Sequence, residues 1–178
     1  MKNKVLEQLQ SYELPPNVIA GVMGNIDVET GGTFDPSTKQ VKGNGYGLFQ
    51  FDFLKPYYKE WLKQNKMKDT AESQVDFFVD TIYGKSQDIL GRKNARNLRQ
   101  ALSSASSPEE AAKVLSEGWF KPGKPHLERR MAAAGTYGAT PQPSQPLQAP
   151  QVEEESLLNP LLRTTDELWG RVKRFWGL

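Results

Sequence analysis

Hydrophobic residues recur at helical spacing along most of the first 138 residues of the chain. One such stripe lies within residues 16–30 and consists of Ile19, Val22, Met23 and Ile26. Apolar positions three and four apart predict an amphipathic helix, and the pattern predicts further helices over residues 4–12, 53–65, 70–83, 95–103, 108–117 and 125–137. Residues 33–52 lack this period, so we expect turns and a small hairpin there. The pattern therefore predicts a mainly α domain over residues 1–138.

The helix expected from residue 108 has a distinct start signal. Ser107 is a typical N-cap, Pro108 suits the first helical position, and Glu109 and Glu110 place negative charge in the first turn. We therefore expect this helix to begin at Pro108.

Glu29 lies on the apolar stripe of the helix over residues 16–30, three positions after Ile26. A carboxyl group on that stripe loses water, which disfavours its charged form. Gly31 and Gly32 are a natural C-terminal stop, so Glu29 also lies near the negative end of the helix dipole. Both effects predict a raised pKa for Glu29, which a general acid requires. The alternative is a side chain at the core edge that points into water.

A glycine-rich aromatic segment follows this helix. It reads Gly43-Asn44-Gly45-Tyr46-Gly47-Leu48-Phe49-Gln50-Phe51. Glycines let a sugar ring approach the backbone, Tyr46 offers a stacking face, and Gln50 offers a hydrogen-bond donor and acceptor. We therefore expect Tyr46, Gly47 and Gln50 to bind a glycan. The alternative is that the glycines only form tight turns and that the apolar residues belong to the core.

Most large aromatic side chains of the expected helices suit the core. Trp119 and Phe120 lie at a helix end, and there we also consider stacking on a sugar. Trp119 is accordingly a candidate substrate-binding residue beside its alternative place in the core.

Several motifs occur in the order of one known family. Glu29-Thr30-Gly31-Gly32 followed by the Gly-Tyr-Gly-Leu-Phe-Gln-Phe run resembles the phage tail lysozyme family and is similar, more distantly, to soluble lytic transglycosylases. Further matches are residues 21–25, 74–78, 119–123, 128–130, 132–134 and Tyr137. The resemblance implies a helical lysozyme-like fold, cleavage of peptidoglycan between its two amino sugars, and Glu29 as catalytic acid. For Arg129 and Arg130 a salt bridge and a contact with a substrate carboxylate both remain open.

A second catalytic carboxylate is less evident. Retaining and inverting glycosidases hold two carboxyl groups ~5 Å or ~6.5–9.5 Å apart. The best-known phage lysozymes carry an Asp nine residues after the Glu, where this chain has Thr38. Asp35 and Asp52 are the nearest acids and are our candidates. Asp35 also suits a turn before Pro36, and Asp52 also suits the start of the next helix.

Glu29 can also act without a second carboxylate. It would protonate the glycosidic oxygen and then serve as base while the 6-hydroxyl of the substrate attacks, which gives an anhydro-muramic product. This is the lytic transglycosylase route, and the sequence leaves it open beside hydrolysis.

The composition argues against several other kinds of site. The chain has no cysteine, and its single histidine, His126, has no acidic cluster around it. We therefore expect neither a metal nor another cofactor. A net charge of +2 without a basic arm argues against a nucleic-acid-binding protein.

The N-terminal sequence lacks the apolar run and cleavage site of a signal peptide, and no stretch of about 18 apolar residues could span a membrane. We therefore expect no signal peptide. The protein would then reach peptidoglycan from within a virion, through a pore or by its own contact with a membrane.

The character of the chain changes after Tyr137. Residues 138–151 hold four prolines and no charge, and three glutamates follow, so we expect a linker over residues 139–155. Residues 156–178 predict an amphipathic helix, with apolar and aromatic side chains on one face and most basic ones outside it. We expect residues 157–178 to bind a virion protein or a membrane surface, with protein docking slightly favoured. Packing on the chain's own domain is the third alternative.

Together with these features, the resemblance implies a phage peptidoglycan hydrolase, either a muramidase or a lytic transglycosylase. We expect it in the virion, in the tail or internally, acting on the host periplasm and cell wall as the genome enters the cell. One alternative is an endolysin for host lysis. The other is a non-catalytic virion protein on a lysozyme-like scaffold.

Overall fold

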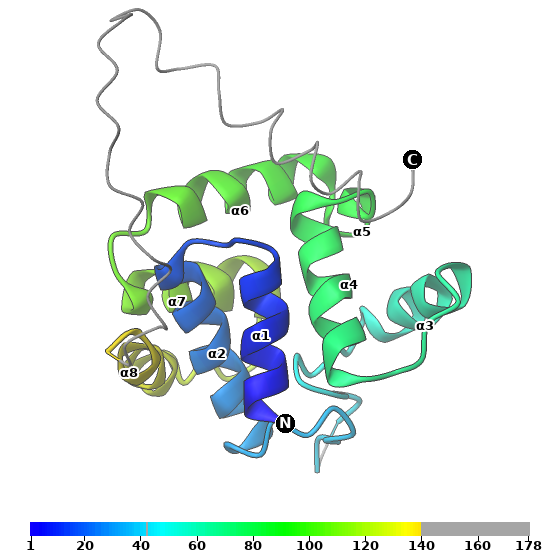
Figure 1. Ribbon diagram of the computed structural model, residues 1–178, viewed down its shortest axis with the longest axis horizontal. Coiled ribbons are helices and arrows are strands. Elements are labelled where there is room, and N and C mark those ends of the chain that lie inside the picture. Colours follow the sequence, from blue (N-terminus) through cyan, green and yellow to red (C-terminus); the bar gives the residue numbers. More distant parts are fainter. Residues whose placement is uncertain (42, 140–178) are drawn as a thin grey trace, which may run out of the picture. The chain divides into compact units, whose positions relative to one another are not determined.

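Helices account for most of residues 1–41 and 43–139, the part of the chain that the computed structural model describes (Figure 1). In chain order they are α1 (Lys2–Ser11), α2 (Pro16–Thr30), α3 (Lys55–Gln64), α4 (Ala71–Tyr83), α5 (Gln87–Leu90), α6 (Arg92–Ser104), α7 (Pro108–Leu115), the π-helix η1 (Ser116–Phe120) and α8 (Leu127–Gly138). Within these residues the only β pairing is an isolated antiparallel bridge between Lys39 and Tyr46. The mainly α class is therefore confirmed, and the arrangement is consistent with the expected lysozyme-like fold. The expected linker beyond Ala139 and the expected terminal helix lie outside the described residues.

The seven helices expected from the sequence correspond to α1, α2, α3, α4, α6, α7 and α8, with bounds that differ by at most three residues. The elements α5 and η1 were not expected. α5 has only four residues, which is too short to show a period, and η1 continues α7 without a break. Between α2 and α3, the bridge from Lys39 to Tyr46 supplies the small hairpin expected within residues 33–52.

α2 is a core helix rather than a surface helix. Every residue from Val18 to Ile26 is buried, because α1, α7 and α8 all pack against it. In Figure 1 these four helices occupy one half of the domain, and α3, α4 and α5 occupy the other. A helix that is buried on all sides positions the residue at its end firmly, and that residue here is Glu29.

Two glycines let the neighbouring helices approach α2 closely. A Cβ atom at Gly21 would lie 2.8 Å from the backbone nitrogen of Ala112 in α7. A Cβ atom at Gly24 would lie 2.5 Å from the backbone nitrogen of Ala134 in α8. Both distances are far below a van der Waals contact. Glycine at these two positions therefore permits the contact of α2 with α7 and α8.

The ends of the helices match their capping residues. The hydroxyl of Ser107 accepts a hydrogen bond from the backbone N–H of Glu110, and α7 begins at Pro108 as predicted. Thr70 and Ser73 form a reciprocal capping box at the start of α4. α2 ends at Gly31, whose φ of +60° and ψ of +34° give the left-handed conformation of a helix C-cap.

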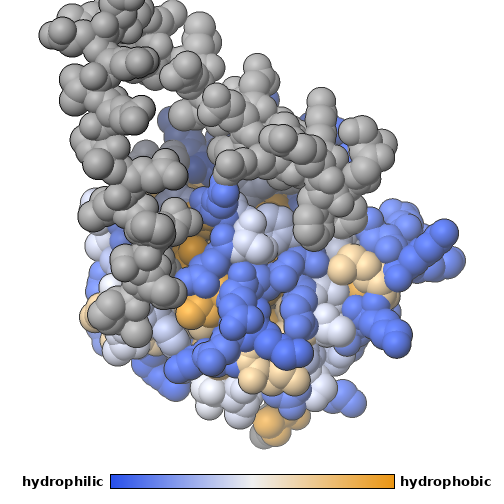
Figure 2. All heavy atoms as spheres, in the orientation of Figure 1, coloured by the Kyte–Doolittle hydropathy of each residue, from blue (hydrophilic) through white to orange (hydrophobic). Residues whose placement is uncertain are grey.

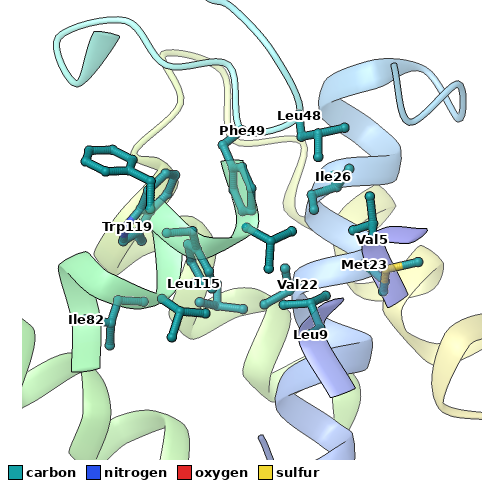
Figure 3. Close-up of a cluster of buried hydrophobic side chains, with 14 of the residues drawn as sticks. Val5, Leu9, Val22, Met23, Ile26, Leu48, Phe49, Ile82, Leu115 and Trp119 are labelled. Atoms are coloured by element: carbon teal, nitrogen blue, oxygen red, sulfur yellow. The ribbon is translucent and has the colours of Figure 1, made fainter. Parts of the chain in front are cut away.

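An aromatic cluster joins the segment between α2 and α3 to the rest of the core. The ring centroid of Phe49 lies 4.9 Å from that of Phe78 in α4 and 5.7 Å from that of Phe120 in η1. Trp119 packs edge-on against Phe49 at 5.3 Å, and Figure 3 shows the two rings beside Leu115. The glycine-rich segment is thus anchored by its own aromatic residues.

Figure 2 shows one face of the molecule, which is mostly hydrophilic with scattered hydrophobic residues. Among the described residues, no helix combines the length and the apolar character needed to cross a membrane.

Candidate active site

Glu29 lies in the last turn of α2, and its side chain is 15% exposed. The carboxylate oxygen Oε1 accepts a hydrogen bond of 2.7 Å from Nη2 of Arg130 in α8. The alternative of a carboxyl group that points freely into water is therefore not what the structure shows.

The second oxygen of Glu29, Oε2, has a different environment from Oε1. Within residues 1–41 and 43–139 no group donates a hydrogen bond to Oε2. Oε2 is also absent from the buried side-chain atoms of this region that lack a partner, a set whose sole member is the hydroxyl of Ser116. One oxygen of the carboxylate is thus fixed by protein, and the other reaches solvent.

The side chain of Arg130 is 2% exposed, and three of its nitrogen atoms donate hydrogen bonds. Nε donates to the carbonyl oxygen of Pro125 at 2.7 Å, and Nη1 donates to Oδ1 of Asn25 at 2.9 Å. Its guanidinium carbon also lies 5.6 Å from the ring centroid of Phe120. Because a guanidinium is planar, these contacts fix the direction in which Nη2 meets Glu29.

Asn25 connects this arrangement to the helix packing. Its side chain is fully buried one turn before Glu29, and its amide nitrogen donates to the carbonyl oxygens of Gly21 and Ala112 at 2.9 and 3.0 Å. Its amide oxygen is therefore free to accept from Arg130. The close approach of α7 and α8 to α2 is what brings these partners within reach.

Arg130 gives Glu29 a cationic partner that the local sequence pattern around Glu29 does not indicate. Asn25 and Arg130 both lie within the motifs that carry the family resemblance. Apart from that, the sequence signal for their contact with Glu29 is only that each is a polar residue with apolar neighbours on its helix face.

The expected glycan-binding residues occupy the hairpin between α2 and α3. The hydroxyl of Tyr46 donates to Oδ2 of Asp69 at 2.6 Å, and Nζ of Lys55 lies 5.1 Å from its ring centroid. Partial burial is the larger cause, and the bond to Asp69 the smaller one, that raise the pKa of Tyr46 to about 12. The hydroxyl of Tyr46 therefore keeps its proton at neutral pH. Gln50 has a positive φ of 48° and donates to the carbonyl oxygen of Gly47 at 2.8 Å.

The two candidates for a second carboxylate, Asp35 and Asp52, both lie in the segment between α2 and α3. Asp35 is exposed, and its Oδ1 accepts bonds of 2.8 Å from both the backbone N–H and the hydroxyl of Ser37. These bonds lower the pKa of Asp35 and close the turn that was the alternative for this residue. Asp52 is exposed, and its carbonyl oxygen accepts from the N–H of Lys55 just before α3. Among the described residues, no hydrogen bond joins either acid to Glu29.

Trp119 belongs to the core in this structure. It is 2% exposed, its ring packs in the aromatic cluster, and its indole N–H donates to the hydroxyl of Thr81 at 3.0 Å. No face of its ring is presented to solvent, so the core is the alternative that the structure favours for Trp119. Phe120, next to it, is partly buried between Phe49 and Arg130.

The described part of the chain contains no group of three or more His, Cys, Asp or Glu side chains arranged to hold a metal ion. His126 is exposed and forms the N-cap position of α8.

Comparison with known proteins identifies a family. The family model described as phage tail lysozyme matches residues 1–139, which include the whole domain described above. No curated protein matches the chain.

Proposed function

The chain belongs to the phage tail lysozyme family, and from this membership we propose that it cleaves the glycan strand of peptidoglycan with Glu29 as general acid. A peptidoglycan-degrading, lysozyme-like function follows from the family itself. The role of Glu29, the product and the setting in the virion are the parts that we propose.

The observation that supports Glu29 most directly is its half-anchored carboxyl group. Arg130 holds Oε1 at 2.7 Å, while Oε2 is open to solvent at the end of a buried helix. A general acid needs this combination of a fixed direction and one accessible oxygen. Oε2 would carry the proton to the glycosidic oxygen as the bond to the anomeric carbon breaks.

The guanidinium of Arg130 supports the same step. Glu29 becomes negatively charged when it transfers its proton, and a cation already in place stabilises that charge. The side chain of Arg130 is 2% exposed, and three of its nitrogen atoms already donate hydrogen bonds within the protein. Arg130 would therefore act on Glu29 rather than on the substrate.

After the glycosidic bond breaks, the Glu29 carboxylate can act as base toward an attacking hydroxyl. If that hydroxyl belongs to water, the product has a reducing end. If it is the 6-hydroxyl of the muramic acid, the product is a 1,6-anhydro sugar. Asp35 and Asp52 remain candidates for a second carboxylate in the hydrolytic route only, and mass spectrometry of the released muropeptides distinguishes the two products.

We place the enzyme in the virion, where it would open the host wall as the genome enters. The description of the matching family as phage tail lysozyme supports this setting over that of an endolysin. Residues 157–178 remain our candidate for the segment that binds a virion protein or a membrane surface. Detection of the protein in purified particles is expected, and its presence only in lysates would favour the endolysin alternative.

The experiment that tests the function compares the full-length wild type with Glu29→Gln on purified peptidoglycan. We expect the wild type to release soluble muropeptides and the variant to release almost none. Glu7→Gln, which changes an exposed glutamate of α1, is the matched control and should retain full activity. If the folded wild type released nothing, the non-catalytic scaffold would be the better description.

A further inference from the structure

Gln74 is a buried polar residue that the mechanism above does not use. It lies in the first turns of α4, and its side chain is fully buried. The amide oxygen Oε1 accepts a hydrogen bond of 2.7 Å from the backbone N–H of Leu48. The amide nitrogen Nε2 donates to the carbonyl oxygen of Pro36 and to Oδ1 of Asp69, both at 2.9 Å. Both N–H groups of the amide therefore donate hydrogen bonds. Two of the three bonds lead to the hairpin, and the third leads to Asp69, which binds Tyr46 of the hairpin.

Two of these bonds lie on opposite sides of the hairpin between α2 and α3. Pro36 precedes the bridge between Lys39 and Tyr46, and Leu48 follows it. One side chain thus ties together the incoming and outgoing backbone at the base of the hairpin. The hairpin's own bonds, such as that from the N–H of Gly47 to the carbonyl oxygen of Thr38 at 2.7 Å, then extend this order outward.

The third bond reaches the aromatic side chain of the hairpin through Asp69. Oδ1 of Asp69 accepts from Gln74 and from the hydroxyl of Tyr58, while Oδ2 accepts from the hydroxyl of Tyr46. Tyr58 of α3 and Gln74 of α4 therefore fix the orientation of the Asp69 carboxylate. This carboxylate in turn fixes the position of the Tyr46 hydroxyl. Gln74 acts on Tyr46 through this link and through the backbone at Leu48.

Gly47 fits closely against the same amide group. Its φ is +78°, which favours glycine, and an added Cβ atom would overlap the Oε1 atom of Gln74. The absence of a side chain at Gly47 thus leaves room for Gln74. Gly47 thus has a role within the hairpin in addition to its expected contact with a sugar ring.

We propose that Gln74 is a positioning residue that fixes the backbone at Pro36 and Leu48 in the conformation that presents Tyr46 to the glycan. The proposal rests on the proposed function, because it assumes that the hairpin binds the glycan strand. Gln74 itself does not touch the substrate. Its effect should therefore appear in glycan affinity more than in the rate of the chemical step.

Gln74→Glu changes the hydrogen bonding with little change in shape. The carboxylate can still accept from Leu48, but it cannot donate to Pro36, and it faces the carboxylate of Asp69. We expect at least a tenfold weaker affinity for soluble glycan strands at pH 7, measured by calorimetry in a Glu29→Gln background in which no cleavage occurs. Acidification should restore part of this affinity, relative to the Glu29→Gln parent at the same pH, because the introduced carboxyl group can donate one hydrogen bond again once it is protonated.

Gln8→Glu is a matched control. Gln8 in α1 also donates from its amide nitrogen to an aspartate on α4, Asp76, but it lies outside the hairpin. This control should lose stability as Gln74→Glu does, because it too places two carboxylates together, yet it should keep the parental glycan affinity. A structural role alone would affect both variants alike.

Hydrogen exchange provides a measurement that does not depend on substrate. In Gln74→Met, which has no acceptor for the N–H of Leu48, the amide of Leu48 should exchange faster while the amides of α2 keep their protection. Unchanged exchange at Leu48 would overturn the proposal, as would unchanged glycan affinity in Gln74→Glu. If the Glu29→Gln parent bound no glycan and the wild type cleaved none, the proposed function would fail, and faster exchange at Leu48 would still establish that Gln74 holds the hairpin.

Discussion

Glu29 and Arg130 are separated by 101 positions in the sequence and share a hydrogen bond of 2.7 Å between α2 and α8. The bond forms because Gly24 and Ala134 let the two helices approach closely and because Asn25 and Pro125 orient the guanidinium. An ion pair with one partner 2% exposed and the other 15% exposed contributes little net stability when intact, but it is costly to break. Its main consequence is to fix the direction of the proposed catalytic group.

Replacement of Arg130 should therefore affect both stability and activity. Arg130→Met leaves the Glu29 carboxylate and two further acceptors without a partner, and we expect a loss of about 3–5 kcal/mol in the free energy of unfolding. Arg130→Lys keeps the charge but cannot reproduce three directed bonds. We therefore expect it to lose less free energy of unfolding than Arg130→Met but still to release muropeptides more slowly than the wild type. Denaturant titration and muropeptide release measure the two effects.

The control for Arg130 is its exposed neighbour. Arg129→Met should change the free energy of unfolding by no more than about 0.5 kcal/mol. An Arg130→Met variant as stable and active as the wild type would show that the ion pair has no role.

The packing of α2 against α8 makes Gly24 sensitive to the smallest substitution. In Gly24→Ala the new methyl group would overlap the backbone of Ala134, so α8 would have to move away from α2. We expect a loss of about 1–3 kcal/mol, measured by denaturant titration, together with reduced activity because Arg130 moves with α8. Gly123→Ala should have almost no effect, because its added Cβ atom has no neighbour within 4 Å. Equal stability of the two variants would contradict the close packing.

The pH dependence of stability should carry a contribution from Asp76. Burial raises the pKa of this carboxyl group in the folded protein, although hydrogen bonds from Tyr12 and Gln8 oppose the rise. The folded state therefore binds the proton more tightly than the unfolded state. Stability from this group is greatest below its unfolded pKa of about 3.9 and falls as the pH rises through its folded pKa.

Asp76→Asn should remove this dependence, because an amide oxygen can still accept from Tyr12 and Gln8 but carries no charge. We expect the variant to gain stability over the wild type as the pH rises from 3 toward 7. Asp88→Asn should show the opposite trend with a smaller amplitude, because the hydrogen bond from Arg92 lowers the pKa of that exposed carboxyl group. Parallel stability curves for the wild type and Asp76→Asn would refute this account of Asp76.

The role of Tyr46 can be divided between its ring and its hydroxyl. Tyr46→Phe keeps the ring but loses the bond to Asp69, whereas Tyr46→Ala loses both. If the ring stacks on a sugar, Tyr46→Ala should weaken glycan binding by more than about 1 kcal/mol, and Tyr46→Phe should weaken it less. Equal losses in the two variants, measured by calorimetry in the Glu29→Gln background, would assign the effect to the hydroxyl.

Periodicity was sufficient for the helices because local sequence determines most of them. Pro16 and Gly31 bound α2 at the residues that the sequence indicated, and Ser107 did the same for the start of α7. Periodicity did not reveal that α2 is buried on all sides, since that depends on glycines that meet helices far along the chain. The π-helix η1 was missed because its five residues follow α7 without a break.

The candidate site was predictable in its parts but not in its contacts. Local motifs indicate Glu29 and the hairpin. Their partners are far along the chain, because Arg130 lies 101 positions from Glu29 and Gln74 lies 26 positions from Leu48. Trp119 was placed on a glycan surface as well as in the core because its position at a helix end suits both. Its burial follows from packing against Phe49 and Phe78, which no local pattern indicates.

The central claim is that the carboxyl group of Glu29 transfers the proton that breaks the glycosidic bond. The most direct measurement is the rate of muropeptide release from purified peptidoglycan by Glu29→Gln, normalised to the folded fraction. Loss of a general acid should lower this rate by about 10²–10⁴-fold with the fold intact. A folded Glu29→Gln variant that releases muropeptides within tenfold of the wild-type rate would contradict the account.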